Sequence, residues 1–202
     1  HRNFLANCRS IGRQKVSDDK DIALSFLPLS HSFERMAGYY YAIYAGTAIA
    51  YAESMDTLLV NLSEIRPTVM TSVPRFYEKV YSLIKTQVED GPAMRRAIFN
   101  WSLGVGRKAS QKIQKKEPLT GWLKLRYNLA SRLVFNKLKE RMGGRLRFFV
   151  TGGAPLAKEI EEFFHAAGIL ILEGYGLTET SPVLTNNRPD DFKFGTVGKP
   201  IP

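Results

Sequence analysis

The sequence has little cysteine and no long apolar run, and both absences narrow the class of protein it can encode. Cys8 is the only cysteine in 202 residues, so no disulfide can form within the chain. A single thiol fits a reducing compartment, and we expect the protein to be cytoplasmic. No stretch approaches the roughly 20 apolar residues that cross a bilayer, and no signal peptide is visible.

Metal-ligand clusters, nucleophile motifs and repeats are also missing. The three histidines and the cysteine do not have the spacing of a metal site. His1 and His165 have no partner pattern, and no serine or cysteine nucleophile accompanies His31 in a recognisable motif. What remains is 44% hydrophobic and 24% charged, which is typical of an ordinary globular chain.

Positive charge is concentrated in one segment. Residues 92–147 hold 15 Lys or Arg against two acids, a local net charge of +13 in a chain of net charge +10. The default interpretation is a solvated helical face. The next is a surface for anionic lipid, and a nucleic-acid surface is third, because no recognition motif accompanies the charge. The apolar residues interleaved with these charges are Phe99, Trp101, Trp122 and Leu123.

Short apolar segments alternate with segments of helical spacing. Alternating strands and helices predict parallel βαβ units. Most of the expected strands are unusually apolar, so helices should cover both faces of the sheet. We therefore expect an α/β fold with a three-layer, flavodoxin-like parallel sheet of about five strands. The expected strands are 22–27, 47–52, 68–73, 145–153 and 169–176.

Helical spacing is clearest in two regions. Residues 31–46 predict a helix that ends at Gly46 and serves either as a pocket wall or as an ordinary core helix. Its apolar residues should share roughly one face, and they are Phe33, Met36, Tyr40, Ile43 and Tyr44. The basic segment predicts two amphipathic helices, the first with Met94, Ile98, Trp101 and Val105 on one face. We expect residues 1–202 to be one α/β subdomain with a helical insertion at about 92–145.

Four of the expected strands end in loops of unusual composition. Ligands of open parallel sheets bind beyond the carboxyl ends of the strands, and these ends share one edge. The sequence therefore predicts a single site built from these loops. The loops are "PLSH" at 28–31, "SVPR" at 72–75, "TGGAP" at 151–155 and "GYGLTE" at 174–179.

The "TGGAP" loop has two interpretations. Its glycines let the backbone approach a flat ligand or a phosphate, and a helix beginning near Pro155 would point free N–H groups at the same space. Alternatively, the segment is only a tight strand-to-helix turn, with Pro155 as the first helical residue.

The "GYGLTE" loop carries more chemical information. Tyr175 can present its ring to an adenine, and Thr178 can offer its hydroxyl to a phosphate oxygen. Glu179 would repel a phosphate, and Mg²⁺ removes that conflict because it favours carboxylate and phosphate oxygens together. Alternatively, the segment is a turn in which Thr178 or Thr180 caps a helix.

Together the loops resemble those of the adenylate-forming enzymes, and within them the long-chain fatty-acid–coenzyme A ligases, or acyl-CoA synthetases. The resemblance spans nearly the whole chain, and the two basic helices are similar to an insertion of the long-chain members. The segments that carry it are "EGYGLTETSP", "FVTGGAPL", "LPLSHSFER", "IRPTVMTSVPRFYEKVY" and "GTVGKPIP".

The resemblance implies a two-step reaction. ATP and a fatty acid give acyl-adenylate and pyrophosphate, and coenzyme A then displaces AMP. Thr178, Glu179 and His31 are implied to act in catalysis, with Glu179 holding Mg²⁺ and His31 close to the substrate carboxylate. The residues implied to bind the nucleotide are Gly152, Gly153, Ala154, Pro155, Glu173, Gly174, Tyr175, Gly176 and Thr178.

The chain also departs from the family pattern. The Ser/Thr/Gly-rich phosphate loop, the ribose-binding aspartate and the lysine-bearing small domain are not in this sequence. We therefore expect an internal fragment of a larger AMP-binding domain that is inactive alone and binds ATP weakly.

Three alternatives to a coenzyme A ligase stay open at this point. They are an adenylate-forming ligase that passes its acyl group to a carrier protein, a non-catalytic lipid-surface module, and a nucleic-acid-binding domain. Intact Tyr175, Thr178 and Glu179 argue against the non-catalytic module. A peripheral position at the inner face of a membrane is compatible with the basic segment.

Overall fold

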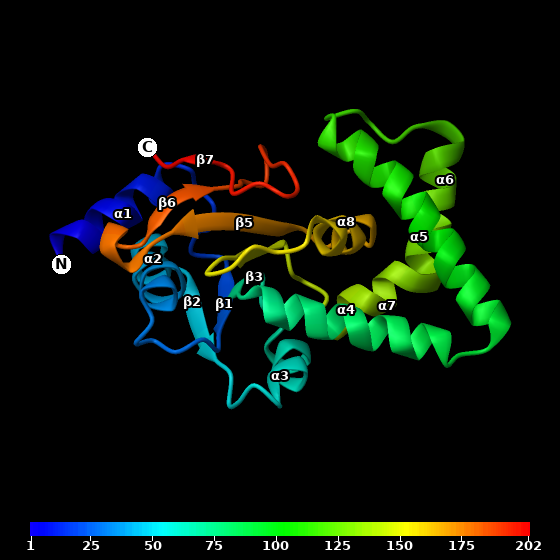
Figure 1. Cartoon of the computed structure of the whole chain (residues 1–202), viewed down its shortest axis with the longest axis horizontal. Helices are drawn as coiled ribbons and strands as arrows, with labels where there is room; N and C mark the ends of the chain where they lie inside the picture. Colours follow the sequence, from blue (N-terminus) through cyan, green and yellow to red (C-terminus); the bar gives the residue numbers. More distant parts are fainter.

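The computed structural model describes residues 1–202, in which a seven-stranded sheet lies between layers of helices (Figure 1). Five parallel strands run in the order β2-β1-β3-β4-β5, which is the order of a flavodoxin-like sheet. The expected α/β fold is confirmed. The five strands are β1 (Ile22–Ser25), β2 (Ala48–Tyr51), β3 (Val69–Ser72), β4 (Phe148–Thr151) and β5 (Ile171–Gly176).

Two further strands make the sheet mixed instead of purely parallel. β6 (Val183–Asn186) pairs antiparallel with β5, and β7 (Lys199–Pro200) pairs antiparallel with β6. The sequence did not predict them, because both are short and lie at the sheet edge without an apolar run. Their effect on the site is direct, since Tyr175 pairs with Thr185 of β6.

One face of the sheet carries the larger core. Successive strand residues point to opposite faces, so Leu24, Met70, Phe149 and Ile171 all face the same layer of helices. This layer consists of α3 (Leu58–Ile65), α4 (Pro74–Glu89) and α8 (Lys158–Ala166). α4 begins with proline at its first position, where the missing N–H costs no hydrogen bond.

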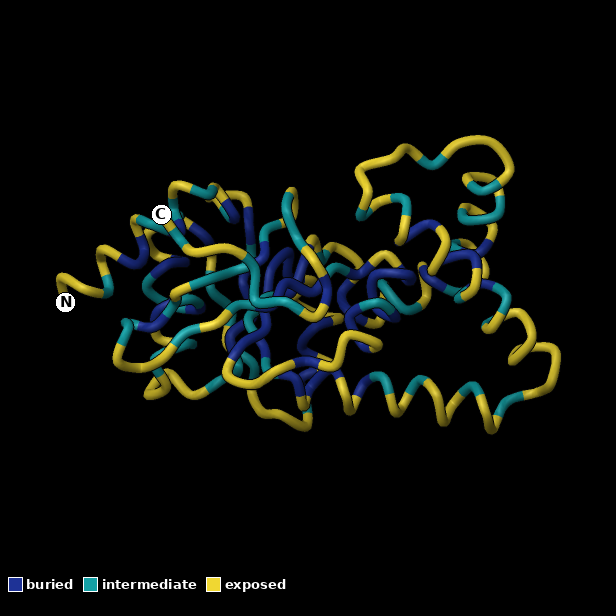
Figure 2. The backbone as a smooth tube through the Cα atoms, turned by 45° about the horizontal axis from the view of Figure 1, so that its top comes forward, coloured by how far each residue is buried: buried dark blue, intermediate teal, exposed yellow.

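The opposite face carries the neighbouring strand residues. Ala23, Val69, Phe148 and Leu172 pack there against α1 (Arg2–Gly12), the π-helix η1 (Glu34–Tyr40) and α2 (Tyr41–Ala45). Figure 2 shows the buried residues concentrated along the sheet and the helices next to it. This alternation explains the three layers, because each of these strands supplies apolar side chains to the helix layers on both faces of the sheet.

The helix expected at 31–46 differs in register from the prediction. It ends at Gly46 as expected, with φ 76°, a conformation that glycine adopts easily. A π-turn holds more residues than an α-turn, so the face beyond η1 is rotated. Ile43 and Tyr44 are therefore exposed, 58% and 50%, and the prediction that they share one face with the buried Met36 is wrong. Tyr41 is buried in their place.

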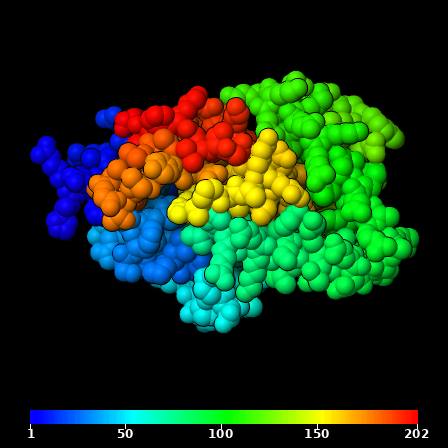
Figure 3. Space-filling model, in the orientation of Figure 1, coloured from blue at the N-terminus to red at the C-terminus, as the bar shows by residue number.

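The basic segment forms a helical hairpin at one end of the molecule (Figures 1 and 3). Its helices are α5 (Ala93–Gln114), α6 (Gly121–Ala130), the π-helix η2 (Ser131–Phe135) and α7 (Asn136–Arg141). Its core joins Val105, Ala130 and Phe135 to Ala167, the residue after α8. No helix in the structure is both long enough and apolar enough to span a bilayer.

The predicted apolar faces of this hairpin are confirmed where Trp101, Val105 and Leu123 pack on its core, and the prediction fails at the start of α5. Met94 is 75% exposed, because the first turn of α5 lies at the outer corner where α4 ends (Figure 1). Phe99, Trp101 and Leu123 do not face solvent beside the charges. They pack against the interior, Phe99 on the main core and the other two on the hairpin core.

Candidate active site

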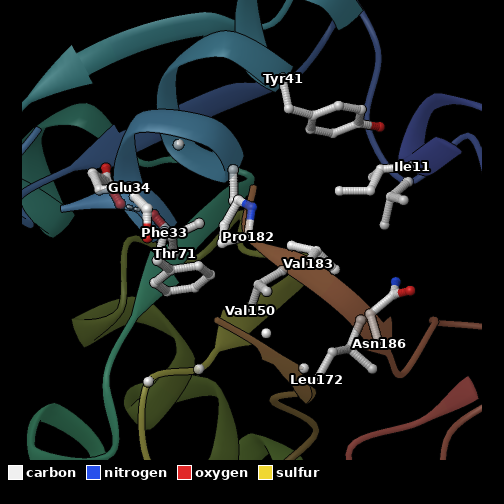
Figure 4. A pocket seen from close by; sticks show the side chains of 18 of the residues that line it. Ile11, Phe33, Glu34, Tyr41, Thr71, Val150, Leu172, Pro182, Val183 and Asn186 are labelled. Atoms are coloured by element: carbon white, nitrogen blue, oxygen red, sulfur yellow. Dashed lines mark hydrogen bonds between the residues drawn. The ribbon is translucent and has the colours of Figure 1, made fainter. Parts of the chain in front are cut away.

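A cavity of about 350 Å³ lies between the sheet and the layer of α1, η1 and α2 (Figure 4). Its volume falls in the range of small-molecule sites. The interior is apolar, and Figure 4 shows helix and strand side chains converging on it. The interior walls include Ile11, Tyr41, Val150, Leu172 and Val183.

The mouth of the cavity is polar and lies at the carboxyl ends of the strands. His31, Gly153, Tyr175, Thr178 and Glu179 all line it. Three of the four predicted loops therefore meet at one site. The "SVPR" loop at 72–75 does not line the cavity. Thr71 lines it, so the next strand residue, Ser72, is directed to the opposite face of the sheet, and α4 begins two residues later.

The "TGGAP" loop meets the cavity through its glycines only. Gly152 and Gly153 line it, and Gly153 has φ +84°, which disfavours any other residue. Ala154 and Pro155 are exposed and do not line it. α8 begins at Lys158, so the expected helix start at Pro155 is wrong. The reason is Leu156, which is held in the main core before the helix begins.

Glu173 faces away from the cavity. It is 5% exposed, next to Leu172, which points to the cavity side of β5. Its carboxylate accepts the Leu156 N–H at 3.4 Å, and its carbonyl oxygen accepts the Asn187 N–H at 3.0 Å. Burial raises the pKa of Glu173. Glu173 therefore links the segment at Leu156 to the segment at Asn187 by hydrogen bonds, below the mouth of the cavity.

Tyr175 stands at the mouth because its neighbours are glycines. A side chain at Gly176 would collide with the carbonyl of Pro182, and one at Gly174 would approach the Thr185 carbonyl to 3.1 Å. The glycines are thus required for the pairing of β5 with β6. Tyr175 itself is 47% exposed, which leaves its ring free for a ligand.

The two threonines of the "GYGLTETSP" segment have different partners. Thr180 stabilises the turn, because its hydroxyl accepts the Leu177 N–H at 3.1 Å and donates to the Pro182 carbonyl at 2.5 Å. The Thr178 hydroxyl instead lies 3.1 Å from the hydroxyl of Ser32. The turn interpretation therefore fits Thr180, and Thr178 is left for the mouth. Ser32 was not predicted, although it follows His31 directly.

Glu179 is an exposed carboxylate on the short 3-10 turn η3 (Thr178–Thr180). The structure contains no group of three or more His, Cys, Asp or Glu that could hold a metal ion. A cation at Glu179 would therefore need ligands from a bound molecule, such as phosphate oxygens.

His31 is exposed beside the mouth. Its Nδ1 accepts the N–H of Phe33 at 3.2 Å, which orients the ring. When the imidazole is neutral, this bond places the proton on Nε2. That nitrogen is then a donor for an anionic group at the mouth.

A buried acid in the cavity wall was missed by the prediction. Glu34 has no exposed surface, and its two carboxylate oxygens accept hydrogen bonds of 2.5 Å from Ser25 and Thr71. Burial raises the pKa of Glu34, although both hydrogen bonds lower it. The available signal was a charged residue between Phe33 and Met36 in an apolar helical pattern.

The sequence matches the family of AMP-binding enzymes over residues 1–202. The chain therefore belongs to this family, as expected from its loops. Long chain acyl-CoA synthetase 6, peroxisomal, of Arabidopsis thaliana is 35% identical over all of this chain and 28% of that protein. The putative fatty-acid–CoA ligase fadD11 of Mycobacterium tuberculosis is 36% identical over all of this chain and 36% of that protein.

Solved structures share the fold. The N-terminal domain of FACL13 from Mycobacterium tuberculosis aligns with a TM-score of 0.65 at 16% identity, over all of this chain and 39% of that one. A benzoate CoA ligase from Burkholderia xenovorans LB400 aligns with a TM-score of 0.63 at 23% identity, over all of this chain and 32% of that one. The chain thus spans about a third of such proteins.

Proposed function

We propose that the longer protein to which this chain corresponds is an ATP-dependent ligase that joins long-chain fatty acids to coenzyme A. The single observation that carries the proposal is the continuity of the cavity. A polar mouth made of the predicted nucleotide loops opens into an apolar interior. A fatty acid has the same polarity, with a carboxylate at one end and a chain that gains about 0.8 kcal/mol for each CH₂ it buries.

We propose that the residues at the mouth assist catalysis by electrostatic stabilisation of the reacting groups. Attack of a carboxylate on the α-phosphate of ATP brings anions together, so donors at that point lower the barrier. The Tyr175 ring would stack on adenine, and the glycine edge of Gly152 and Gly153 would let it approach. The Thr178 hydroxyl would donate to a phosphate oxygen, and His31 Nε2 to the substrate carboxylate.

Glu179 fits a magnesium ion that is shared with phosphate. It is an exposed, lone carboxylate next to the Thr178 hydroxyl, and Mg²⁺ is usually held by one or two carboxylates plus phosphate oxygens. When bound, the ion would neutralise negative charge on the phosphates. Glu179 itself would hold the ion at the mouth, and Glu173 would act through the loops instead of touching the nucleotide.

The test uses the full-length protein and an Ala37→Phe variant. Ala37 lines the cavity from η1, so a phenyl ring there would shorten the space for a chain. We expect the KM for a long-chain fatty acid to rise about tenfold or more, while that for a short acid stays within about twofold. An equal rise in KM for both acids would contradict the proposal that the cavity holds the acyl chain of the fatty acid.

The acceptor is tested separately. We propose coenzyme A, and transfer to an acyl carrier protein but not to coenzyme A would support the other adenylate-forming reaction instead. The 202-residue chain alone should form no acyl-adenylate and bind ATP weakly. Calorimetry that finds tight, Mg²⁺-dependent binding of ATP to this chain would contradict that part of the proposal.

We also propose a peripheral location at the inner, cytoplasmic face of a membrane. The support is the local net charge of +13 in residues 92–147, which would attract anionic lipid. A nucleic-acid partner is not proposed. Retention on duplex DNA that falls steeply with added salt would argue for it.

A further inference from the structure

Helix α6 carries an apolar stripe that no other part of the chain covers. Trp122, Leu125 and Leu129 are 71%, 58% and 49% exposed, and their spacing of three and four residues places them on one helix face. Leu133, in the following η2 segment, is 43% exposed and extends the stripe. We call these four residues the α6 stripe.

The opposite face of the same helix already has its packing partners. Leu123, Tyr127 and Ala130 belong to the hairpin core, together with residues of α5 and η2. The helix therefore does not need the stripe for its own packing. Four large apolar side chains in water on one short helix form the kind of patch that marks an interaction site.

Cations accompany the stripe. Three exposed cations lie along α6, η2 and α7, and none of them belongs to an ion pair of the structure. They are Lys124, Arg132 and Lys137. Arg126, also on α6, lies over the Trp101 ring at 5.6 Å, and this contact directs its side chain toward α5 without neutralising its charge. An apolar helical face bordered by Lys and Arg is the pattern of helices that lie in a membrane interface.

We propose that the α6 stripe is the surface by which this chain docks on an anionic lipid bilayer. The helix would lie in the plane of the interface, with Trp122 and the leucines among the acyl chains and the cations among the lipid phosphates. A nucleic acid could pair its phosphates with the cations, but it would leave the apolar stripe exposed to water. A second copy would satisfy the stripe and bring the two sets of positive charge together.

The position of α6 fits this orientation. The helix lies at one end of the molecule, and the carboxyl end of β5, which carries the cavity mouth, points to the other end (Figure 1). Docking through the stripe would therefore leave the mouth in water. The inference rests on the proposed peripheral location and is independent of the ligase reaction.

The experiment uses Trp122 as its own reporter. The chain has two tryptophans, so Trp101→Phe leaves Trp122 as the only one. We expect a blue shift of its emission, and sedimentation with vesicles of phosphatidylcholine and phosphatidylserine but not with phosphatidylcholine alone. Added salt should weaken the binding, because exposed charges are screened.

Three variants locate the surface. Leu125→Ser with Leu129→Ser should weaken vesicle binding about tenfold or more. Arg132→Glu should weaken it about fivefold or more, because Arg132 is exposed, lies three residues after Leu129, and each basic residue near the surface matters on this scale. Leu5→Ser is the matched control, because Leu5 is 45% exposed on α1 and should bind as the parent does. Circular dichroism checks that every variant is folded.

Several outcomes would overturn the proposal. They are equal binding to neutral and anionic vesicles, unchanged binding of the double serine variant, and loss of binding in the Leu5 control. Blue-shifted, quencher-protected Trp122 in the full-length protein without vesicles would show that another segment covers the stripe. Lipid-free dimerisation that the double variant abolishes would assign the stripe to a second copy. Ligase activity is not a readout in any of these arms.

Discussion

The carboxylate of Glu34 accepts a 2.5 Å hydrogen bond from the hydroxyl of Thr71 (Figure 4). The two residues lie 37 positions apart, on η1 and on β3, and Glu34 is fully buried. The bond therefore fixes the first turn of η1 against the carboxyl end of the sheet. His31 and Ser32 stand just before that turn, so the same bond helps to place the mouth.

Removal of the Glu34 carboxylate should loosen this wall. Glu34→Ala leaves the Ser25 and Thr71 hydroxyls unpaired around a new cavity, and we expect a loss of about 3 kcal/mol in the free energy of unfolding. Glu34→Gln keeps the shape and an acceptor, so it should lose about 1 kcal/mol. Urea unfolding of the 202-residue chain measures both. Losses of less than about 0.5 kcal/mol in both variants would show that these hydrogen bonds contribute little.

The two threonines of the mouth should separate in function. In the full-length protein, Thr178→Val should lower kcat/KM for adenylate formation about tenfold or more while the melting temperature stays within about a degree. Thr180→Val should lower the melting temperature, because it removes the turn bonds to Leu177 and Pro182. Pyrophosphate exchange and thermal melting are the two measurements. A stability loss for Thr178→Val as large as that for Thr180→Val would assign both residues to the turn.

Glu161 should make stability depend on pH. It is 1% exposed, accepts the Gly195 N–H at 2.6 Å and lies near Glu173. Burial raises its pKa from 4.5 to about 7, so the folded chain holds a proton that the unfolded chain releases. Its contribution is therefore fully present below about pH 4.5 and is lost as the pH rises through about 7.

The Glu161→Gln variant tests this sign. It should be more stable than the parent chain by about 3 kcal/mol near pH 8, and the advantage should disappear near pH 4. Burial lowers the pKa of His165 to about 4, so that residue acts in the opposite direction, and the variant and parent must be compared at equal pH. A constant difference at every pH would show that Glu161 does not titrate in this range.

Asp21 directly precedes β1 and links the amino ends of β1 and β3, at the edge of the sheet opposite Glu34 and Thr71. It is 3% exposed, pairs with Arg147 at 2.5 Å and accepts the Thr68 hydroxyl at 2.6 Å. Burial alone would raise the pKa of Asp21, but the bonds from Arg147 and Thr68 outweigh it and hold the pKa below its usual value. The ion pair therefore contributes stability above the ordinary pKa of an aspartate, and this stability is lost as the pH falls through the lowered one.

Arg147→Met should cost about 2 kcal/mol near neutral pH, because it leaves a buried carboxylate without its cation. The deficit should shrink in acid, where Asp21 is protonated in both proteins. Urea unfolding at a neutral and an acidic pH measures the difference. An unchanged deficit in acid would mean that Arg147 stabilises through its packing on the Phe148 ring, 5.4 Å away, and not through its charge.

The sequence determined the class of fold and the family. Buried parallel strands are short apolar runs between helices, so β1, β3, β4 and β5 and their order of appearance could be predicted. The glycine-rich loops at strand ends carried the family resemblance. These signals are local, because each depends on residues within about ten positions of one another.

The tertiary structure decided which of the candidate residues share a space. The sequence could not separate Thr178 from Thr180, because the difference lies in distant partners, Ser32 for one and the Pro182 turn for the other. The π-helix, which rotates Ile43 and Tyr44 outward, is also a tertiary effect, since helical spacing alone assumes 3.6 residues per turn. Trp122 is exposed whereas Trp101 packs on the hairpin core, and this difference has the same origin. The packing of neighbouring helices determines which tryptophan is covered, and the sequence alone cannot tell because Lys and Arg flank both Trp101 and Trp122.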